Sequence, residues 1–157
     1  ACGFVGNSIQ EVVALSRAVT EVSHNHPEGI KGAEATAVAI YLARTGSSII
    51  EIRDYIDKHY YPMNFTLDSI RESYHFDVSC QGSVPQAIRA FLEGQDFEDV
   101  IKLAISIGGD SDTIAAIAGS IAEGMWGTPE YFALRAFEKL DEFLLSSLTK
   151  SVKFLAE

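Results

Sequence analysis

The sequence has few of the residues that cross-link a chain or interrupt its helices. It contains 4 prolines and 2 cysteines among 157 residues. Two thiols do not amount to a disulfide framework, and a chain of this length buries enough surface to fold without one. We therefore expect reduced cysteines and a cytoplasmic location.

Long apolar runs and positive charge are also lacking. No stretch reaches the roughly 20 uninterrupted apolar residues of a membrane span. The 12 basic residues are outnumbered by 22 acidic ones, which gives a formal net charge of −10. Because this charge repels nucleic-acid backbones and anionic membranes, we expect neither as a partner. An anionic ligand would have to be held locally, by a metal ion or by helix N-termini.

Helix-forming sequence is abundant. Ala, Ile, Leu, Glu and Lys dominate windows longer than about ten residues, which predicts one all-α domain over residues 1–157. Ser8 and Ser48 each precede a glutamate with the spacing of a capping box, so helices are expected to begin there. The expected helices cover residues 8–23, 27–44, 48–59, 67–73, 83–92, 96–107 and 111–126, with a last one from 128 onward.

Two of these helices carry an apolar stripe that is predicted to face the core. The stripes consist of Val12, Leu15, Val19 and Val22 in the first helix, and of Leu134, Phe137, Leu140, Leu144 and Leu148 in the last.

The helix at 111–126 is built from Ile, Ala and Gly and is predicted to be central, because it has almost no polar face.

The densest cluster of chemically active residues is Gly-Gly-Asp-Ser-Asp-Thr at 108–113. Asp110, Asp112 and Thr113 offer hard oxygen ligands of the kind that Mg²⁺ prefers, and the glycines allow a sharp turn. Helix capping by Asp110 or Ser111 explains the same residues on spacing alone. A third interpretation is the Asp-x-Asp nucleophile of haloacid dehalogenase-type phosphatases, which would require an α/β sheet.

A second cluster, Ser-His-Asn-His-Pro-Glu-Gly, occupies residues 23–29. His24, His26 and Glu28 are candidates for a transition-metal site. Alternatively, His24 precedes a helix whose free N–H groups, with Gly29 allowing close approach, bind a phosphate. For His26 a capping or packing role is preferred.

A third helix start is predicted at Ser83-Val84-Pro85. An N-cap serine with proline in the first turn explains this segment by itself. Cys80 is a weaker candidate, as a thiol nucleophile, because no histidine neighbours it in the sequence.

Three segments, taken together and in this order, resemble consecutive signatures of the ADP-ribosylglycohydrolase family, the family of dinitrogenase reductase-activating glycohydrolase. They are Ser-His-Asn-His-Pro-Glu-Gly-Ile-Lys-Gly-Ala at 23–33, Gly-Ser-Val-Pro-Gln-Ala-Ile at 82–88 and Ile-Gly-Gly-Asp-Ser-Asp-Thr-Ile-Ala-Ala-Ile-Ala-Gly at 107–119. The resemblance implies an orthogonal all-α bundle around two Mg²⁺ ions. It also implies hydrolysis of the N- or O-glycosidic bond between ADP-ribose and a modified protein or small acceptor.

The same resemblance assigns roles to individual residues. Asp110, Asp112 and Thr113 would be metal ligands. His24 would contact the diphosphate or the distal ribose of ADP-ribose, with Gly29 at the adjacent helix entrance. The nucleotide pocket would be lined by Ser83, Val84 and Pro85.

The resemblance further implies a longer protein. Family members have an N-terminal half that supplies more metal ligands, the catalytic acidic residue and a glycine-rich phosphate loop, and no segment of this sequence resembles them. We therefore expect the C-terminal portion of such an enzyme, inactive by itself, that associates with the absent half or with a second copy. The alternative is a non-catalytic relative, either an ADP-ribose-binding protein or a crystallin-like structural protein.

Overall fold

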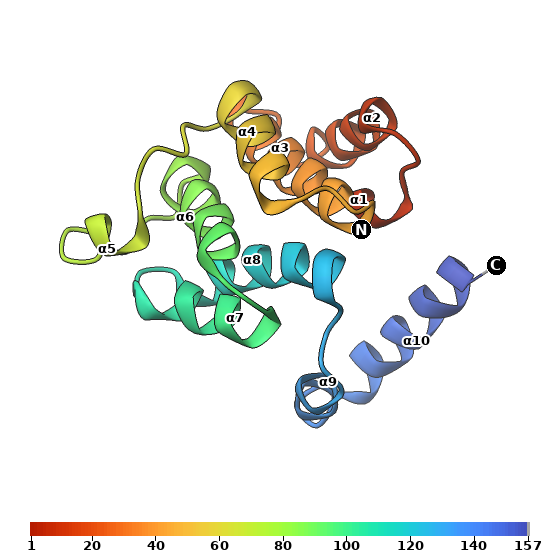
Figure 1. Cartoon of the computed structure of the whole chain (residues 1–157). Helices are drawn as coiled ribbons and strands as arrows, with labels where there is room; N and C mark the ends of the chain where they lie inside the picture. Colours follow the sequence, from red (N-terminus) through yellow and green to blue (C-terminus); the bar gives the residue numbers. More distant parts are fainter. Residues whose placement is uncertain (157) are drawn as a thin grey trace. The chain divides into compact units, whose positions relative to one another are not determined.

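The structure, a computed structural model, describes the backbone of residues 1–156 and the side chains of residues 1–151. Over this range the chain forms ten helices and no strand, which confirms the all-α prediction (Figure 1). The chain divides into two compact units, Ala1–Gly127 and Thr128–Glu157. None of the described helices has the length and apolar character needed to cross a membrane.

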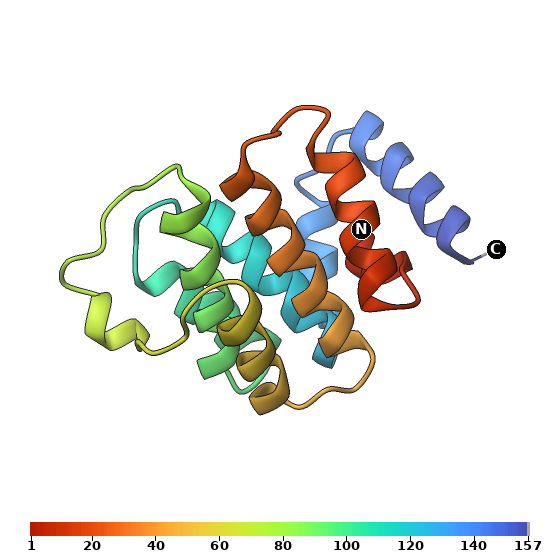
Figure 2. The ribbon, with the colours of Figure 1, turned by 90° about the horizontal axis from the view of Figure 1, so that it is seen from above.

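The first unit is arranged around one central helix, α3. This helix contacts α1, α2, α4, α6 and α8. Figure 2 shows α3 between α2 and α6, with α8 packed along it. The helices of this unit are α1 (Cys2–Val5), α2 (Ile9–Thr20), α3 (Pro27–Arg44), α4 (Ile49–His59), α5 (Leu67–Ile70), α6 (Cys80–Glu93), α7 (Phe97–Ser106) and α8 (Ser111–Trp126).

The main core lies where α3, α4, α6, α7 and α8 meet. Phe91, Ile114 and Ile121 are among its largest fully buried side chains. Small residues bring the central helices together: a Cβ atom at Gly124 of α8 would lie 3.1 Å from the carbonyl oxygen of Ile40 on α3. The prediction that the 111–126 helix is central is therefore confirmed, with the same bounds.

The predicted helix starts at Ser8, Ser48 and Asp96 are confirmed by their hydrogen bonds. Each of these side chains accepts a backbone N–H from the residue three positions further on. Ser48 and Glu51 form a complete capping box, because the Glu51 carboxylate also accepts the backbone N–H of Ser48 at 2.8 Å and its hydroxyl at 2.7 Å.

This capping box makes α4 sensitive to acid. The hydrogen bonds from the Ser48 hydroxyl and backbone lower the pKa of Glu51 below its ordinary value of 4.5. A carboxyl group with a lower pKa in the folded state stabilises the fold above its unfolded pKa, and this stabilisation is lost as the pH falls through the folded pKa. We expect the difference in thermal unfolding midpoint between wild type and Glu51→Gln to shrink between neutral pH and about pH 3.

The matched control for this prediction is Glu72→Gln, which replaces an exposed glutamate outside the capping box. Its difference from wild type should change less over the same pH range. A Glu51→Gln difference that is independent of pH would contradict the stabilising role of the ionised carboxylate.

The predicted apolar face of the first helix is only partly correct. Val12 is fully buried against Ala37 and Val38 of α3, but Val19 is 66% exposed and Val22 is 85% exposed. The buried line of α2 instead continues through Ser16, one turn after Val12. The apolar spacing identified the helix but not the line along which it contacts α3.

The predicted start of α6 at Ser83 and Pro85 is wrong. The helix begins at Cys80, and its N-cap is Ser79, whose hydroxyl accepts the N–H of Gly82 at 3.1 Å. Ser83 lies one turn inside the helix and donates its hydroxyl to the carbonyl of Ser79 at 2.9 Å. Pro85 is the sixth residue of this helix, past the first turn, so its missing N–H leaves the carbonyl of Gln81 without its helical donor.

The single last helix expected from residue 128 onward is also wrong. The second unit contains two helices, α9 (Glu130–Phe137) and α10 (Glu142–Ala156). The break is stabilised by Asp141, whose carboxylate accepts the N–H of Leu144 at 2.8 Å. Within this unit the apolar stripe forms no core of its own, because none of the described side chains of residues 128–151 is buried.

Candidate functional site

The turn between α7 and α8 presents two adjacent carboxyl groups. Gly108 and Gly109 both have positive φ, at 73° and 68°, so the turn depends on residues without a Cβ atom. Asp110 follows at the N-cap position of α8, yet its side chain makes no capping hydrogen bond. Helix capping therefore does not account for the Asp110 carboxylate.

Asp112, in the first turn of α8, is paired with Asp110. A hydrogen bond with the Asp110 carboxyl group, followed by the backbone N–H of Thr113, lowers the pKa of Asp112. The N–H of Thr113 lies 3.0 Å from Oδ1 of Asp112. Asp112 and Thr113 are exposed, so their oxygen atoms face solvent.

This donor set fits Mg²⁺, which is commonly bound through one or two carboxylates and keeps several water ligands. It does not fit zinc or another transition metal that requires several nitrogen or sulfur ligands. In the part of the chain that the structure describes, no three His, Cys, Asp or Glu side chains come together to hold a metal ion. The transition-metal site suggested by His24, His26 and Glu28 is therefore not formed.

The two histidines have different roles. Nδ1 of His26 accepts the N–H of Glu28 at 3.3 Å, which makes His26 the N-cap of α3 and confirms the capping role preferred from the sequence. His24 lies outside the helix, and its Nδ1 is 2.8 Å from the Ser23 hydroxyl. The His24 side chain is exposed to solvent.

A pocket of about 500 Å³, which we call the His24 pocket, lies between the starts of α3 and α6. His24, Gly29 and Glu28 border it from one helix start, and Ser79, Cys80 and Gln81 from the other. The first N–H groups of an α-helix have no partner within the helix, and the helix dipole places partial positive charge there. Two such ends bordering one pocket provide a local site for an anion in an acidic protein.

A second hollow, which we call the central groove, has a volume of about 400 Å³ and shares His24, Gly29 and Cys80 with the His24 pocket. Its walls come from α1, α2, α3, α6 and α8, and they are mostly apolar. Gly32 is essential to its shape, because a Cβ atom there would lie 3.1 Å from Cβ of Cys80. Gly32 and Cys80 hold α3 and α6 in close contact.

The structure brings most of the predicted substrate-binding residues together. His24, Gly29 and Val84 border the central groove, although Val84 is buried in α6 together with Ser83 and Pro85. Ile117 also borders the groove, and Thr113 precedes it by one turn of α8, about 6 Å along the helix axis. The groove and the Asp110–Asp112 turn are therefore neighbours along the same helix.

Sequence reasoning missed Arg71 and Tyr74 in the segment between α5 and α6. Tyr74 is partly buried, and burial, followed by the negative charges of Asp77 and Asp110, raises its pKa. Arg71 donates two hydrogen bonds to Ser106 at the end of α7. The sequence signal was only an aromatic cluster in an irregular segment, which does not say what the rings contact.

Comparison with known proteins identifies the fold. The family model described as ADP-ribosylglycohydrolase matches residues 1–146. The chain belongs to the ADP-ribosylglycohydrolase family. An uncharacterized protein of Archaeoglobus fulgidus is 43% identical over 44 residues, which are 28% of this chain and 14% of that protein. The aligned stretch therefore covers only a small part of the length of this curated relative.

ADP-ribosylglycohydrolases are hydrolases that act on glycosidic bonds to ADP-ribose and typically use Mg²⁺. The all-α structure agrees with this family and excludes the interpretation as a haloacid dehalogenase-type phosphatase. That interpretation requires a sheet, and residues 1–156 contain no strand. The Asp-x-Asp sequence at 110–112 lies at the start of a helix instead.

Proposed function

We propose that this chain contributes to the Mg²⁺-dependent hydrolysis of the bond between ADP-ribose and a modified protein or small acceptor. The observation that carries the proposal is the adjacent pair Asp110 and Asp112 at the mouth of α8, with an Asp110 carboxylate that makes no capping hydrogen bond. The family match supports the substrate class and crosses the boundary between the two units, so we treat residues 1–157 as one domain.

In this proposal Asp110, Asp112 and Thr113 hold Mg²⁺, with two ions in the complete site. The bound metal would supply a Lewis acid that polarises the ribose hydroxyls and activates water. The exposure of Asp112 and Thr113 leaves room for the water ligands that Mg²⁺ retains. The two carboxylates supply the negative charge that attracts the ion.

The diphosphate of ADP-ribose is assigned to the His24 pocket. The net charge of −10 disfavours an anion at long range, so binding must come from the N-termini of α3 and α6 and from His24. Gly29 borders the pocket and has no side chain that would keep a ligand away from the backbone. Val84 provides apolar contact along the central groove, beside the buried Ser83 and Pro85.

Calorimetry with ADP-ribose tests this assignment through the two histidines. His24→Ala should weaken binding by roughly tenfold, because it removes a hydrogen bond to a charged ligand. His26→Ala should change the affinity little but lower the free energy of unfolding by about 1 kcal/mol, because it removes the N-cap of α3. Equal effects of the two substitutions on affinity would contradict the assignment.

A parallel assay of ADP-ribose release separates enzyme from binding protein. Mg²⁺-dependent release from an ADP-ribosylated substrate supports the hydrolase. Tight binding of ADP-ribose without release would agree with a non-catalytic relative or with a chain that is inactive by itself.

A further inference from the structure

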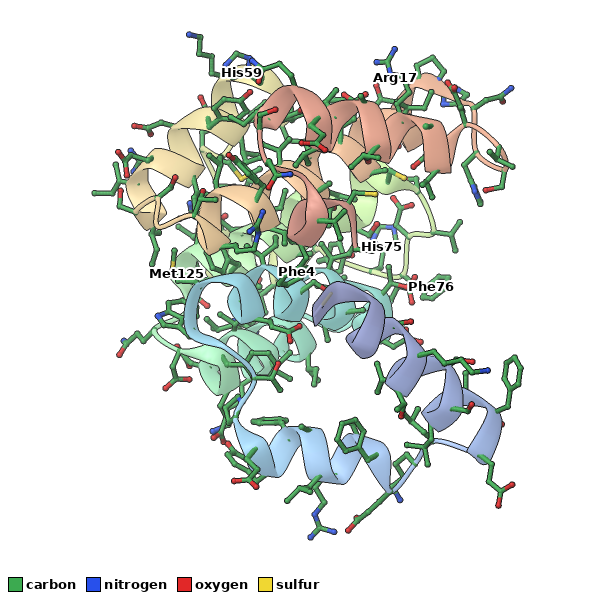
Figure 3. The ribbon with its side chains drawn as sticks, turned by 90° about the vertical axis from the view of Figure 1, so that its right-hand side faces the viewer. Phe4, Arg17, His59, His75, Phe76 and Met125 are labelled. Atoms are coloured by element: carbon green, nitrogen blue, oxygen red, sulfur yellow. The ribbon has the colours of Figure 1, made fainter. Side chains whose placement is uncertain are left out.

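The segment between α4 and α6 holds the turn that carries the proposed metal ligands. Figures 1 and 2 both show α5 and the loop after it beside the turn between α7 and α8. Two side chains of this segment, Arg71 and Tyr74, make the contacts. Figure 3 labels His75 and Phe76 on the continuation of the same loop.

Arg71 fixes the end of α7, just before the turn. Its Nη1 donates to the carbonyl and to the hydroxyl of Ser106, both at 2.8 Å. The other side of the guanidinium contacts Oδ1 of Asp68 at 3.1 and 3.2 Å, which orients the group. A cation at the C-terminal end of a helix satisfies carbonyls that have no helical donor and is favoured by the helix dipole.

Tyr74 fixes the turn itself. A Cβ atom at Gly109 would lie 2.5 Å from Cε1 of Tyr74, so the ring is packed directly against the glycine. The Tyr74 hydroxyl donates to the carbonyl of Gly82 in the first turn of α6 at 2.6 Å. One side chain thus connects the turn before Asp110 with the helix that borders the groove.

Asp110 is hydrogen-bonded to Asp112 of the same turn, but helix capping does not hold it in place. Its side chain makes no capping bond, and the two preceding glycines leave the backbone free to adopt several conformations. We infer that Arg71 and Tyr74 are positioning residues that set the geometry of Asp110 and Asp112 and thereby the affinity of this turn for a divalent cation. This inference rests on the proposed function, because it presupposes a metal ion at Asp110 and Asp112.

Binding of Mn²⁺ to the whole chain tests the inference without requiring turnover. Free Mn²⁺ is measured by electron paramagnetic resonance in titrations of wild type, Arg71→Gln, Arg71→Lys and Tyr74→Phe. Substitution of residues that orient metal ligands commonly costs about tenfold or more in affinity, and we expect this loss for Arg71→Gln. Tyr74→Phe should lose less Mn²⁺ affinity than Arg71→Gln, because phenylalanine keeps the ring against Gly109. Arg71→Lys should recover part of the affinity, because lysine can still donate to Ser106.

The controls remove similar interactions from other parts of the first unit. Arg53→Gln removes an exposed arginine paired with Asp54 on α4. Tyr41→Phe removes a tyrosine hydroxyl bonded to a backbone carbonyl, that of Asn7. Both should bind Mn²⁺ as wild type does, even where their thermal unfolding midpoints fall as much as those of the test variants.

Two outcomes would overturn the inference in distinguishable ways. Wild-type Mn²⁺ affinity in both Arg71→Gln and Tyr74→Phe would overturn the positioning role and leave the metal site standing. Absence of Mn²⁺ binding by the wild-type chain would overturn the metal site, and the positioning role with it. The metal site is supported if Mg²⁺ competes with Mn²⁺ for binding to the wild-type chain. The positioning role is supported if Arg71→Gln and Tyr74→Phe bind Mn²⁺ more weakly while the control variants bind it as wild type does.

Discussion

Replacing Asp110 and Asp112 together by asparagine is expected to abolish Mg²⁺ binding at the mouth of α8. Asparagine keeps the size of each side chain but removes both negative charges, and Mg²⁺ depends on carboxylates for affinity. We expect the affinity measured by calorimetry to fall by about 100-fold or more, and Mg²⁺-dependent release of ADP-ribose to be lost with it.

The stability of the double variant should not fall in parallel. The Asp110 side chain makes no capping bond, and asparagine at both positions can still form a hydrogen bond between the two side chains. Asp54→Asn is the matched control, because it neutralises an exposed aspartate of α4 that pairs with Arg53 at 2.7 Å. Unchanged release of ADP-ribose by the double variant would refute the metal-binding role.

Phe91→Ala is expected to cause the largest loss of stability. The Phe91 ring on α6 is fully buried, and its centroid lies 5.7 Å from the ring of Trp126 at the end of α8. Truncating a buried phenylalanine to alanine typically costs 3–5 kcal/mol, so we expect a loss of about 4 kcal/mol in the free energy of unfolding. Trp126 is the single tryptophan of the chain, and its fluorescence in a urea titration reports this change.

Phe143→Ala provides the comparison for the same change of side chain. Phe143 lies in α10 and is 77% exposed, so its truncation should alter the free energy of unfolding by less than about 0.5 kcal/mol. Similar losses for the two variants would show that burial at Phe91 does not govern the stability of the first unit.

Features that depend on neighbours in the sequence were predictable. The Ser48–Glu51 capping box was found with the predicted partners, since both side chains bond to backbone groups within one turn. The helix of residues 111–126 has the predicted bounds, because Gly108 and Gly109 precede it and Gly127, with a φ of 75°, follows it. The capping role of His26 was also anticipated.

Helix boundaries were not predictable where the sequence offers more than one possible helix cap. Ser79 and Ser83 are both plausible N-caps, and the structure selects Ser79 because the helix beginning there buries Ser83, Val84 and Pro85 against the rest of the unit. Asp141 divides the last helical segment, although the apolar spacing continues across it. The cap at Asp141 begins a new helix, and the described apolar side chains of residues 128–151 form no core within the second unit.

The candidate site was predictable residue by residue but not as an assembly. The sequence singled out His24, Asp110 and Asp112 from their chemistry and the family resemblance. It did not show that Tyr74 packs against Gly109, or that Cys80 lies against Gly32, because these contacts join segments that are distant along the chain. Nor did it show that Ser83, Val84 and Pro85 are all buried in α6, with Val84 also bordering the groove.

The sequence alone determined the helical class, most helix starts and the chemical character of the candidate ligands, because caps, glycines and carboxylates act within a few residues. The tertiary structure decided which face of α2 is buried, that two helix N-termini border one pocket, and that Arg71 and Tyr74 contact the turn before Asp110. These features depend on packing between helices, and helix packing is fixed by the shapes of side chains that meet only once the chain has folded.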